Sequence, residues 1–201
     1  MDTGPATRMR ADARRNRERL LAAALAAFAE RGSDDTSLEE IARRAGVGIG
    51  TLYRHFPTRQ SLLEAVYRDQ VDALCAGAGP LLAGHSPGDA LAAWLRSLTQ
   101  FGLTKRSLSA ELLAGPEGGT APVASASRAE ITASAEALLR QAQEAGQARP
   151  ELTAGDLLRL SHAIVVATER AADRAQEAER LLAIVLGGIF TPPAGGSRRE
   201  C

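Results

Sequence analysis

Apolar residues recur along this chain at the three- and four-residue spacing of amphipathic helices, and short segments with glycine or proline separate them. The first apolar stripe contains Leu20, Ala24 and Phe28 and ends at Gly32. Alanine and leucine dominate the composition, and runs of β-branched residues are short. The pattern predicts an all-α fold of about nine helices, over residues 14–31, 38–45, 49–56, 58–78, 89–104, 107–113, 123–145, 153–169 and 175–190.

The most informative stretch is a pair of short predicted helices joined by a glycine turn, residues 36–56. Thr36 and Ser37 each stand three residues before a glutamate, which is the spacing of a capping box at a helix N-terminus. Gly46 fits the left-handed residue that ends the first helix, and Leu52 gives the second helix an inward face. Two helices around a tight turn form the arrangement that lays the second helix in the major groove of DNA. Spacing alone leaves an ordinary helical pair as an alternative.

Residue identity favours DNA binding. The run AGVGIGTLYRHFPTRQSLLEAVY, from Ala45 to Tyr67, closely resembles the DNA-binding domain of the tetracycline repressor (TetR) family of bacterial transcription regulators. The resemblance extends over residues 14–70, and the remainder of the chain is similar to the family only in length and helical character. It implies a regulator, more often a repressor than an activator, that binds a palindromic double-stranded DNA operator as a homodimer and responds to a small-molecule effector.

The second short helix should carry the side chains that read bases. A recognition helix uses the residues at its N-terminal end, where Thr51 can hydrogen-bond a base edge and the methyl groups of Ile49 and Thr51 can meet a thymine methyl. In proteins that this stretch resembles, the positions of Tyr53 and His55 commonly contact phosphates, and Arg59 replaces a phosphate-binding lysine. A half-buried aromatic and a helix C-cap are the alternatives for Tyr53 and His55. The predicted DNA-binding residues are Thr36, Arg43, Arg44, Gly48, Ile49, Gly50, Thr51, Tyr53, Arg54, His55 and Arg59.

The N-terminal segment is polar and rich in arginine. We predict that residues 1–13 form a disordered arm. Six arginines between Arg8 and Arg19 oppose two acids, Asp12 and Glu18, whereas the whole chain has a formal net charge of zero. Such a run is usually a solvated helix face, but its place before a DNA-binding motif favours contact with phosphates or the adjacent minor groove.

The predicted C-terminal domain, residues 71–190, contains the remaining helices. The resemblance implies an effector pocket here, although Trp94 and Phe101 could simply fill the core; with few charges inward, a pocket would favour a largely apolar ligand. The last two helices are apolar over more of their circumference than a lone surface helix can bury, which permits dimerisation through them. The predicted pocket residues are Trp94, Leu98, Phe101, Leu138 and His162, and the predicted dimer contacts are Leu157, Ile164, Val165, Leu181, Leu182 and Val185.

Other function classes find little support in the sequence. Cys75 and Cys201 are isolated, with no second ligand at metal spacing, and no catalytic Ser/His/Asp set stands out. Ser161 and His162 are neighbours on one predicted helix, point about 100° apart and cannot pair as nucleophile and base. We therefore expect a soluble, cytoplasmic protein that is not an enzyme and has no metal or cofactor, with a disordered tail at residues 191–201. An effector-independent regulator remains an alternative, as does a helical small-molecule-binding protein or enzyme.

Overall fold

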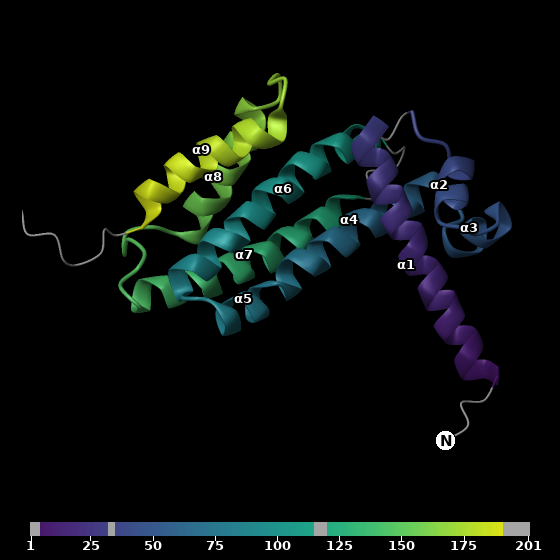
Figure 1. The fold of residues 1–201 in the computed structure, drawn as a ribbon, viewed down its shortest axis with the longest axis horizontal. Helices are drawn as coiled ribbons and strands as arrows, with labels where there is room; N and C mark the ends of the chain where they lie inside the picture. Colours follow the sequence, from purple (N-terminus) through teal and green to yellow (C-terminus); the bar gives the residue numbers. More distant parts are fainter. Residues whose placement is uncertain (1–4, 32–34, 115–119, 191–201) are drawn as a thin grey trace, which may run out of the picture. The chain divides into compact units, whose positions relative to one another are not determined.

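The computed structural model of this chain describes residues 5–31, 35–114 and 120–190, with side chains described for 9–30, 35–104 and 125–190. Helices account for nearly all of these residues, and the predicted all-α fold is confirmed (Figure 1). The helices are α1 (Pro5–Arg31), α2 (Leu38–Arg44), α3 (Ile49–His55), α4 (Arg59–Ala76), α5 (Ala78–Gly84), α6 (Pro87–Ala114), α7 (Thr120–Glu144), α8 (Ala154–Ala167) and α9 (Arg174–Ile189).

Three segments differ from the sequence-based prediction. Residues 5–13, predicted as part of a disordered arm, are the first turns of α1; Pro5 suits the first position of a helix because its φ is preset and it has no amide hydrogen to leave unpaired. Residues 79–84, which lie between two predicted helices, belong to α5 (Ala78–Gly84), in which Pro80 lies within the first turn and is tolerated. The helices predicted separately at 89–104 and 107–113 are one helix, α6, because neither glycine nor proline separates them. The predicted tail, 191–201, lies outside the described residues.

The chain forms two compact units. The first consists of Met1–Gln70 with Thr104–Ala124, and the second of Val71–Leu103 with Ser125–Cys201, within the limits of the described residues. The sequence-based domains assign residues 104–124 to the C-terminal domain, whereas the described residues among them, 104–114 and 120–124, group with the first unit. Helices α4, α6 and α7 each contribute residues to both units. In the part of the chain that the structure describes, no helix has the length and apolar character of a membrane span.

The first unit has a core built by the helices of the predicted DNA-binding motif. α1 packs against α2, and α2 packs against α3. Phe28 of α1, Ile41 of α2 and Leu52 of α3 are fully buried, together with Leu62 from the start of α4. Burial of each large apolar side chain contributes about 1.5–3 kcal/mol relative to exposure. The short helices α2 and α3 therefore depend on α1 and α4 for their stability, since isolated helices of about two turns do not persist in water.

The second unit has its own core around Trp94. This indole is fully buried, and its Nε1 donates a hydrogen bond to the carbonyl of Leu74 at 3.0 Å. Close to it, α6 and α8 share a buried hydroxyl pair, Thr99 and Ser161, with 3.0 Å between the two oxygens. α8 also packs against α9. The α8 N-terminus is closed by the reciprocal capping box that Thr153 forms with Asp156, as predicted for a helix starting there.

Candidate nucleic-acid interface

The turn between α2 and α3 is fixed by a single left-handed glycine. Gly46 has φ +65°, which an L side chain rarely adopts. Its amide donates to the carbonyl of Arg43 at 3.1 Å, and the amide of Val47 donates to the carbonyl of Ala42 at 3.0 Å. This pair of bonds is the Schellman motif, which satisfies the last carbonyls of a helix. The backbone geometry thus sets where α3 begins relative to α2.

The outer face of α3 has few large side chains. Leu52 is fully buried and Phe56, which follows the helix, is 3% exposed, so these two hold α3 on the first unit. Ile49 and Tyr53, four residues apart, are 37% and 46% exposed. Gly50 lies between them on the exposed side. Adjacent exposed apolar and aromatic side chains of this kind are typical of a surface that a partner covers.

The glycines at the start of α3 are not required by the protein's own packing. A Cβ added at Gly48 or Gly50 would have no neighbour within 4 Å, and neither residue has a positive φ. Bare backbone at this position instead permits close approach of another molecule. Thr51 and His55 are half-buried, and Arg54 is exposed. Seven predicted DNA-binding residues thus retain exposed surface at this helix: Gly48, which caps it, and Ile49, Gly50, Thr51, Tyr53, Arg54 and His55 within it.

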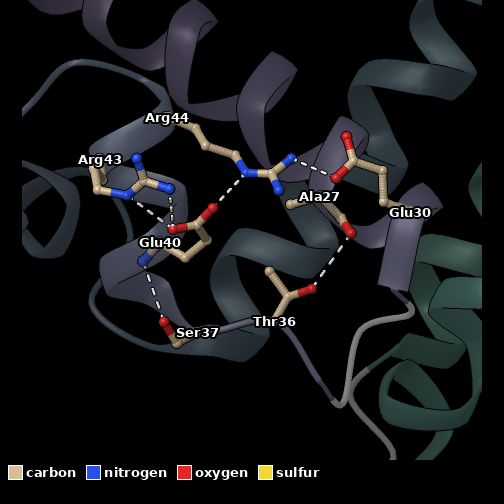
Figure 2. Close-up of polar contacts among 7 residues, drawn as sticks. All are labelled: Ala27, Glu30, Thr36, Ser37, Glu40, Arg43 and Arg44. Atoms are coloured by element: carbon tan, nitrogen blue, oxygen red, sulfur yellow. Dashed lines mark hydrogen bonds and ion pairs between the residues drawn. The ribbon is translucent and has the colours of Figure 1, made fainter.

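A carboxylate on α2 organises the arginines around it (Figure 2). Glu40 accepts from Arg43 through Nε at 2.9 Å and Nη2 at 2.6 Å, and from Nε of Arg44 at 2.7 Å. Arg44 also donates through Nη1 to Glu30 of α1 at 2.8 Å. Hydrogen bonds from Arg44 and then from Arg43 lower the pKa of Glu40 from 4.5 to about 2. The Ser37 hydroxyl caps the same helix by accepting from the amide of Glu40 at 3.1 Å.

This network gives the two arginines different surroundings. The Arg44 side chain is 24% exposed and joins α2 to α1, so it stabilises the first unit as well as being a predicted DNA contact. The Arg43 side chain is 75% exposed and remains accessible to a phosphate. Glu40 was predicted to take part in helix capping alone, and its bonds to the two arginines are a further role. The spacing of Glu40 to Arg43 and Arg44, three and four residues, is the signal that could have shown it.

Thr36 was predicted to bind DNA, but in the structure it is buried. Its side chain is 3% exposed, and its hydroxyl donates to the carbonyl of Ala27 at 3.4 Å. The carbonyl of Thr36 accepts a 2.6 Å hydrogen bond from Nη1 of Arg59, whose guanidinium carbon lies 5.8 Å from the ring centroid of Phe28. Arg59, predicted as a phosphate contact, is therefore half-buried and joins the start of α4 to α1 and to the segment before α2.

The residues predicted for an effector pocket in the second unit differ widely in burial. Trp94 and Leu138 are fully buried, Leu98 is nearly so, and Phe101 is half-buried. His162 is exposed, so its predicted place among inward-facing residues is wrong. An open groove of about 620 Å³ lies between α7 and the start of α8 and is lined by none of these five residues.

The predicted dimer contacts need a similar correction. Leu157, Ile164 and Val165 of α8 and Leu182 of α9 are at most 5% exposed because they pack within their own chain, so they are not on the surface of the protomer. Leu181 and Val185 are half-buried. The opposite sides of α8 and α9 expose other apolar residues, and hydrophobicity alone could not assign the two sides. The outward residues are Leu160 (38% exposed), Val166 (42%) and Ile184 (63%).

Known bacterial regulators are similar to this chain along nearly its whole length. Residues 20–66 match the family described as bacterial regulatory proteins, tetR family, and residues 86–191 match the C-terminal domain of SbtR-like transcriptional regulators. The HTH-type transcriptional regulator UidR of Escherichia coli (strain K12) is 31% identical over 194 residues, which cover 91% of this chain and 97% of that protein.

Two solved structures have a similar fold. A TetR transcriptional regulator from Streptomyces coelicolor is 38% identical, with a TM-score of 0.77, and the match covers 89% of this chain and 99% of that one. A TetR transcription regulatory protein from Mycobacterium vanbaalenii is 34% identical, with a TM-score of 0.73 and coverage of 91% and 99%. The helix-turn-helix geometry, the two matched domains and these full-length relatives agree, and the chain belongs to the TetR family of bacterial transcriptional regulators.

Proposed function

We propose that this DNA-binding regulator is a cytoplasmic repressor that binds a palindromic operator as a homodimer and is released by a small, largely apolar effector. The observation that supports it most is the outer face of α3, where Ile49 and Tyr53 flank bare backbone at Gly50. This surface leaves apolar side chains exposed to water in the free protein, and it allows a DNA duplex to approach closely.

On this proposal α3 lies in the major groove. The methyl groups of Ile49 and Thr51 contact thymine methyls, and the Thr51 hydroxyl bonds a base edge. Tyr53, Arg54 and His55, nearer the C-terminal end of the helix, contact the phosphates on either side. Phosphate contacts fix the position of the protein and carry little sequence information. Thr51 and Ile49 therefore carry the choice of sequence, with DNA shape as a further contribution.

One such module contacts too few base pairs for selectivity, so the proposal requires two recognition helices about 34–36 Å apart. The outward apolar side chains of α8 and α9 support a two-fold interface in that part of the chain. Gly187 and Gly188 support it further, because both are exposed on α9 and a Cβ on either would meet nothing within 4 Å. Close packing of a partner helix against them would remove Ile184, 63% exposed, from water.

The effector belongs to the second unit in this proposal, and the interior there is apolar. Among the predicted pocket residues Phe101 is half-buried, between the full burial of Trp94 and the exposure of His162. The full burial of Trp94 and Leu138 also favours a second candidate, a regulator that binds DNA without any effector. A thermal-shift screen with compounds made or consumed by the products of neighbouring genes separates the two candidates, since binding to the folded state raises the unfolding temperature.

A gel shift combined with sedimentation tests the proposal. The wild-type protein should sediment as a dimer and shift DNA from upstream of its own gene at one preferred palindrome, with steep salt dependence. Ile184→Arg should give monomers that no longer bind the palindrome. Ala83→Arg, which adds the same charge at an exposed position of α5, should behave as wild type. A solitary wild-type protomer, or no shift at any salt concentration, would contradict the proposal.

A further inference from the structure

The first turns of α1 contact little of their own protein. Between residues 9 and 19 every described side chain is exposed or half-buried, and burial begins at Leu20. A 27-residue helix is thus packed along only its second half, and its first turns extend past α2 and α3 (Figure 1). A largely polar helical segment of this kind gains little from tertiary packing, so its exposed surface is available to a partner outside the chain.

Three arginines of this segment lie on the same stripe of α1 as the buried apolar residues further along the helix. Arg10, Arg14 and Arg17 follow spacings of four and three residues, which place them on one stripe of the helix. The same alternation continues with Leu21, Ala24 and Phe28, all at most 3% exposed. One stripe of α1 is therefore apolar where the helix packs on the first unit and basic where it runs beyond it.

The basic stripe lies on the side of the recognition helix. The guanidinium carbon of Arg17 is 5.8 Å from the ring centroid of Phe56, the residue that ends α3. Of the other arginines in this segment, Arg15 pairs with Asp12 and Arg19 donates to Asn16 at 2.8 Å. Within the stripe, Arg14 has an exposed ion pair with Glu18 at 3.6 Å, a type of pair that contributes at most about 1 kcal/mol and yields readily to a competing anion.

We infer that the first turns of α1 bind the phosphate backbone of the duplex beside the α3 half-site, through Arg10, Arg14 and Arg17. An arginine-rich arm can contact the phosphates or enter the adjacent minor groove. The helical state of this segment decides between the two. An α-helix with its side chains is about 10–12 Å wide, whereas the minor groove is about 6 Å wide. The segment therefore lies across the backbone and does not read bases, so it strengthens binding to every sequence alike.

The salt dependence of binding gives the size of the effect. Each phosphate neutralised adds about 0.9 to the slope of log K against log salt concentration. Arg10→Gln with Arg14→Gln removes two such contacts per protomer, so the slope for a dimer should become shallower by roughly 3.6. Between 50 and 200 mM salt, the loss of affinity should then be roughly 100-fold smaller than for wild type. This inference rests on the proposed function, because it needs a protein that binds duplex DNA.

The experiment measures affinity over a salt series, for the preferred palindrome and for unrelated DNA of equal length. The double glutamine variant should show the shallower slope with both DNAs, and Arg10→Lys with Arg14→Lys should restore the wild-type slope. Arg140→Gln with Arg149→Gln, an equal change of charge at exposed positions of the second unit, should leave the slope unchanged. Thermal unfolding should be alike for all three variants because the altered side chains are exposed.

Two results would overturn the inference while leaving the proposed function intact. The first is that the wild-type protein binds its palindrome and the double glutamine variant binds it with the same salt-dependence slope. The second is a variant that changes the preference between A·T and G·C pairs beside the half-site, which would place the arginines in the minor groove. A wild-type protein that binds no DNA would overturn the proposed function, and this inference with it.

Discussion

Replacing Arg59 by alanine and by lysine separates a stabilising role from a DNA-binding one. In the folded chain this side chain donates to the carbonyl of Thr36 at 2.6 Å and stacks over Phe28 at 5.8 Å from the ring centroid. Both partners belong to the first unit, so Arg59 joins the start of α4 to α1 and to the segment that precedes α2. Its alternative role, taken from family resemblance, is contact with a DNA phosphate.

The size of the stabilising role follows from these two contacts. A hydrogen bond from a charged donor contributes about 1.5–3 kcal/mol, and the half-buried position of Arg59 favours the lower end. A partly exposed cation–π contact adds about 0.5 kcal/mol. Arg59→Ala should therefore lower the free energy of unfolding by about 2 kcal/mol, which corresponds to roughly 4–8 °C in Tm for a chain of this size.

Urea denaturation and a DNA titration on the same variants provide the measurement. Arg59→Ala should lose stability and bind all DNA more weakly, whereas Arg59→Lys should lose stability but keep most of the affinity, since an ammonium can hold a phosphate but lacks the planar fork. Arg96→Ala, which removes an exposed arginine that pairs with Glu179 at 2.9 Å, is the control and should change stability by less than about 1 kcal/mol. Wild-type stability in Arg59→Ala would refute the structural role.

Three further predictions concern other parts of the chain. Gly102→Ala should lower the free energy of unfolding by about 1 kcal/mol, because its Cβ would lie 2.8 Å from Cγ2 of Val165. Adding Val165→Ala should remove this steric conflict, and a double-mutant cycle of urea unfolding measures the difference. Glu40 has a folded-state pKa lowered from 4.5 to about 2, so its contribution to stability is present above pH 4.5 and is lost as pH falls towards 2; acid unfolding of Glu40→Gln should depend less on pH in that window. Tyr53→Phe should weaken binding to operator and unrelated DNA by the same factor in a fluorescence titration, and unequal factors would count against a phosphate contact.

Local signals in the sequence predicted much of the helix-turn-helix. Ser37 caps α2 because a hydroxyl three residues before Glu40 can reach its amide without help from distant residues. Gly46 was predicted to end the helix for an equally local reason, the left-handed φ it adopts. The identity of the residues from Ala45 to Tyr67 then indicated the family, which the comparisons confirm.

Contacts between distant residues explain most of the errors. Thr36 and Ser37 have the same spacing to a glutamate, yet Thr36 is buried because the carbonyl of Ala27, nine residues earlier, accepts its hydroxyl. The apolar residues of α8 are divided between its two sides by packing against α6 and α9, which hydrophobicity does not reveal. The predicted start of α1 was wrong because an arginine-rich segment without a buried face resembles a disordered arm.

The claim that α3 reads the operator is tested most directly by ranking a set of operator variants by affinity, for wild type and for Thr51→Ala. Thr51 is half-buried at the first turn of α3, so its loss should leave the fold intact and remove one base contact, worth about 1–3 kcal/mol between the right and the wrong base. The account predicts that Thr51→Ala changes the order of the variants at one symmetric pair of positions. An unchanged order, with affinity lowered equally for all of them, would contradict it.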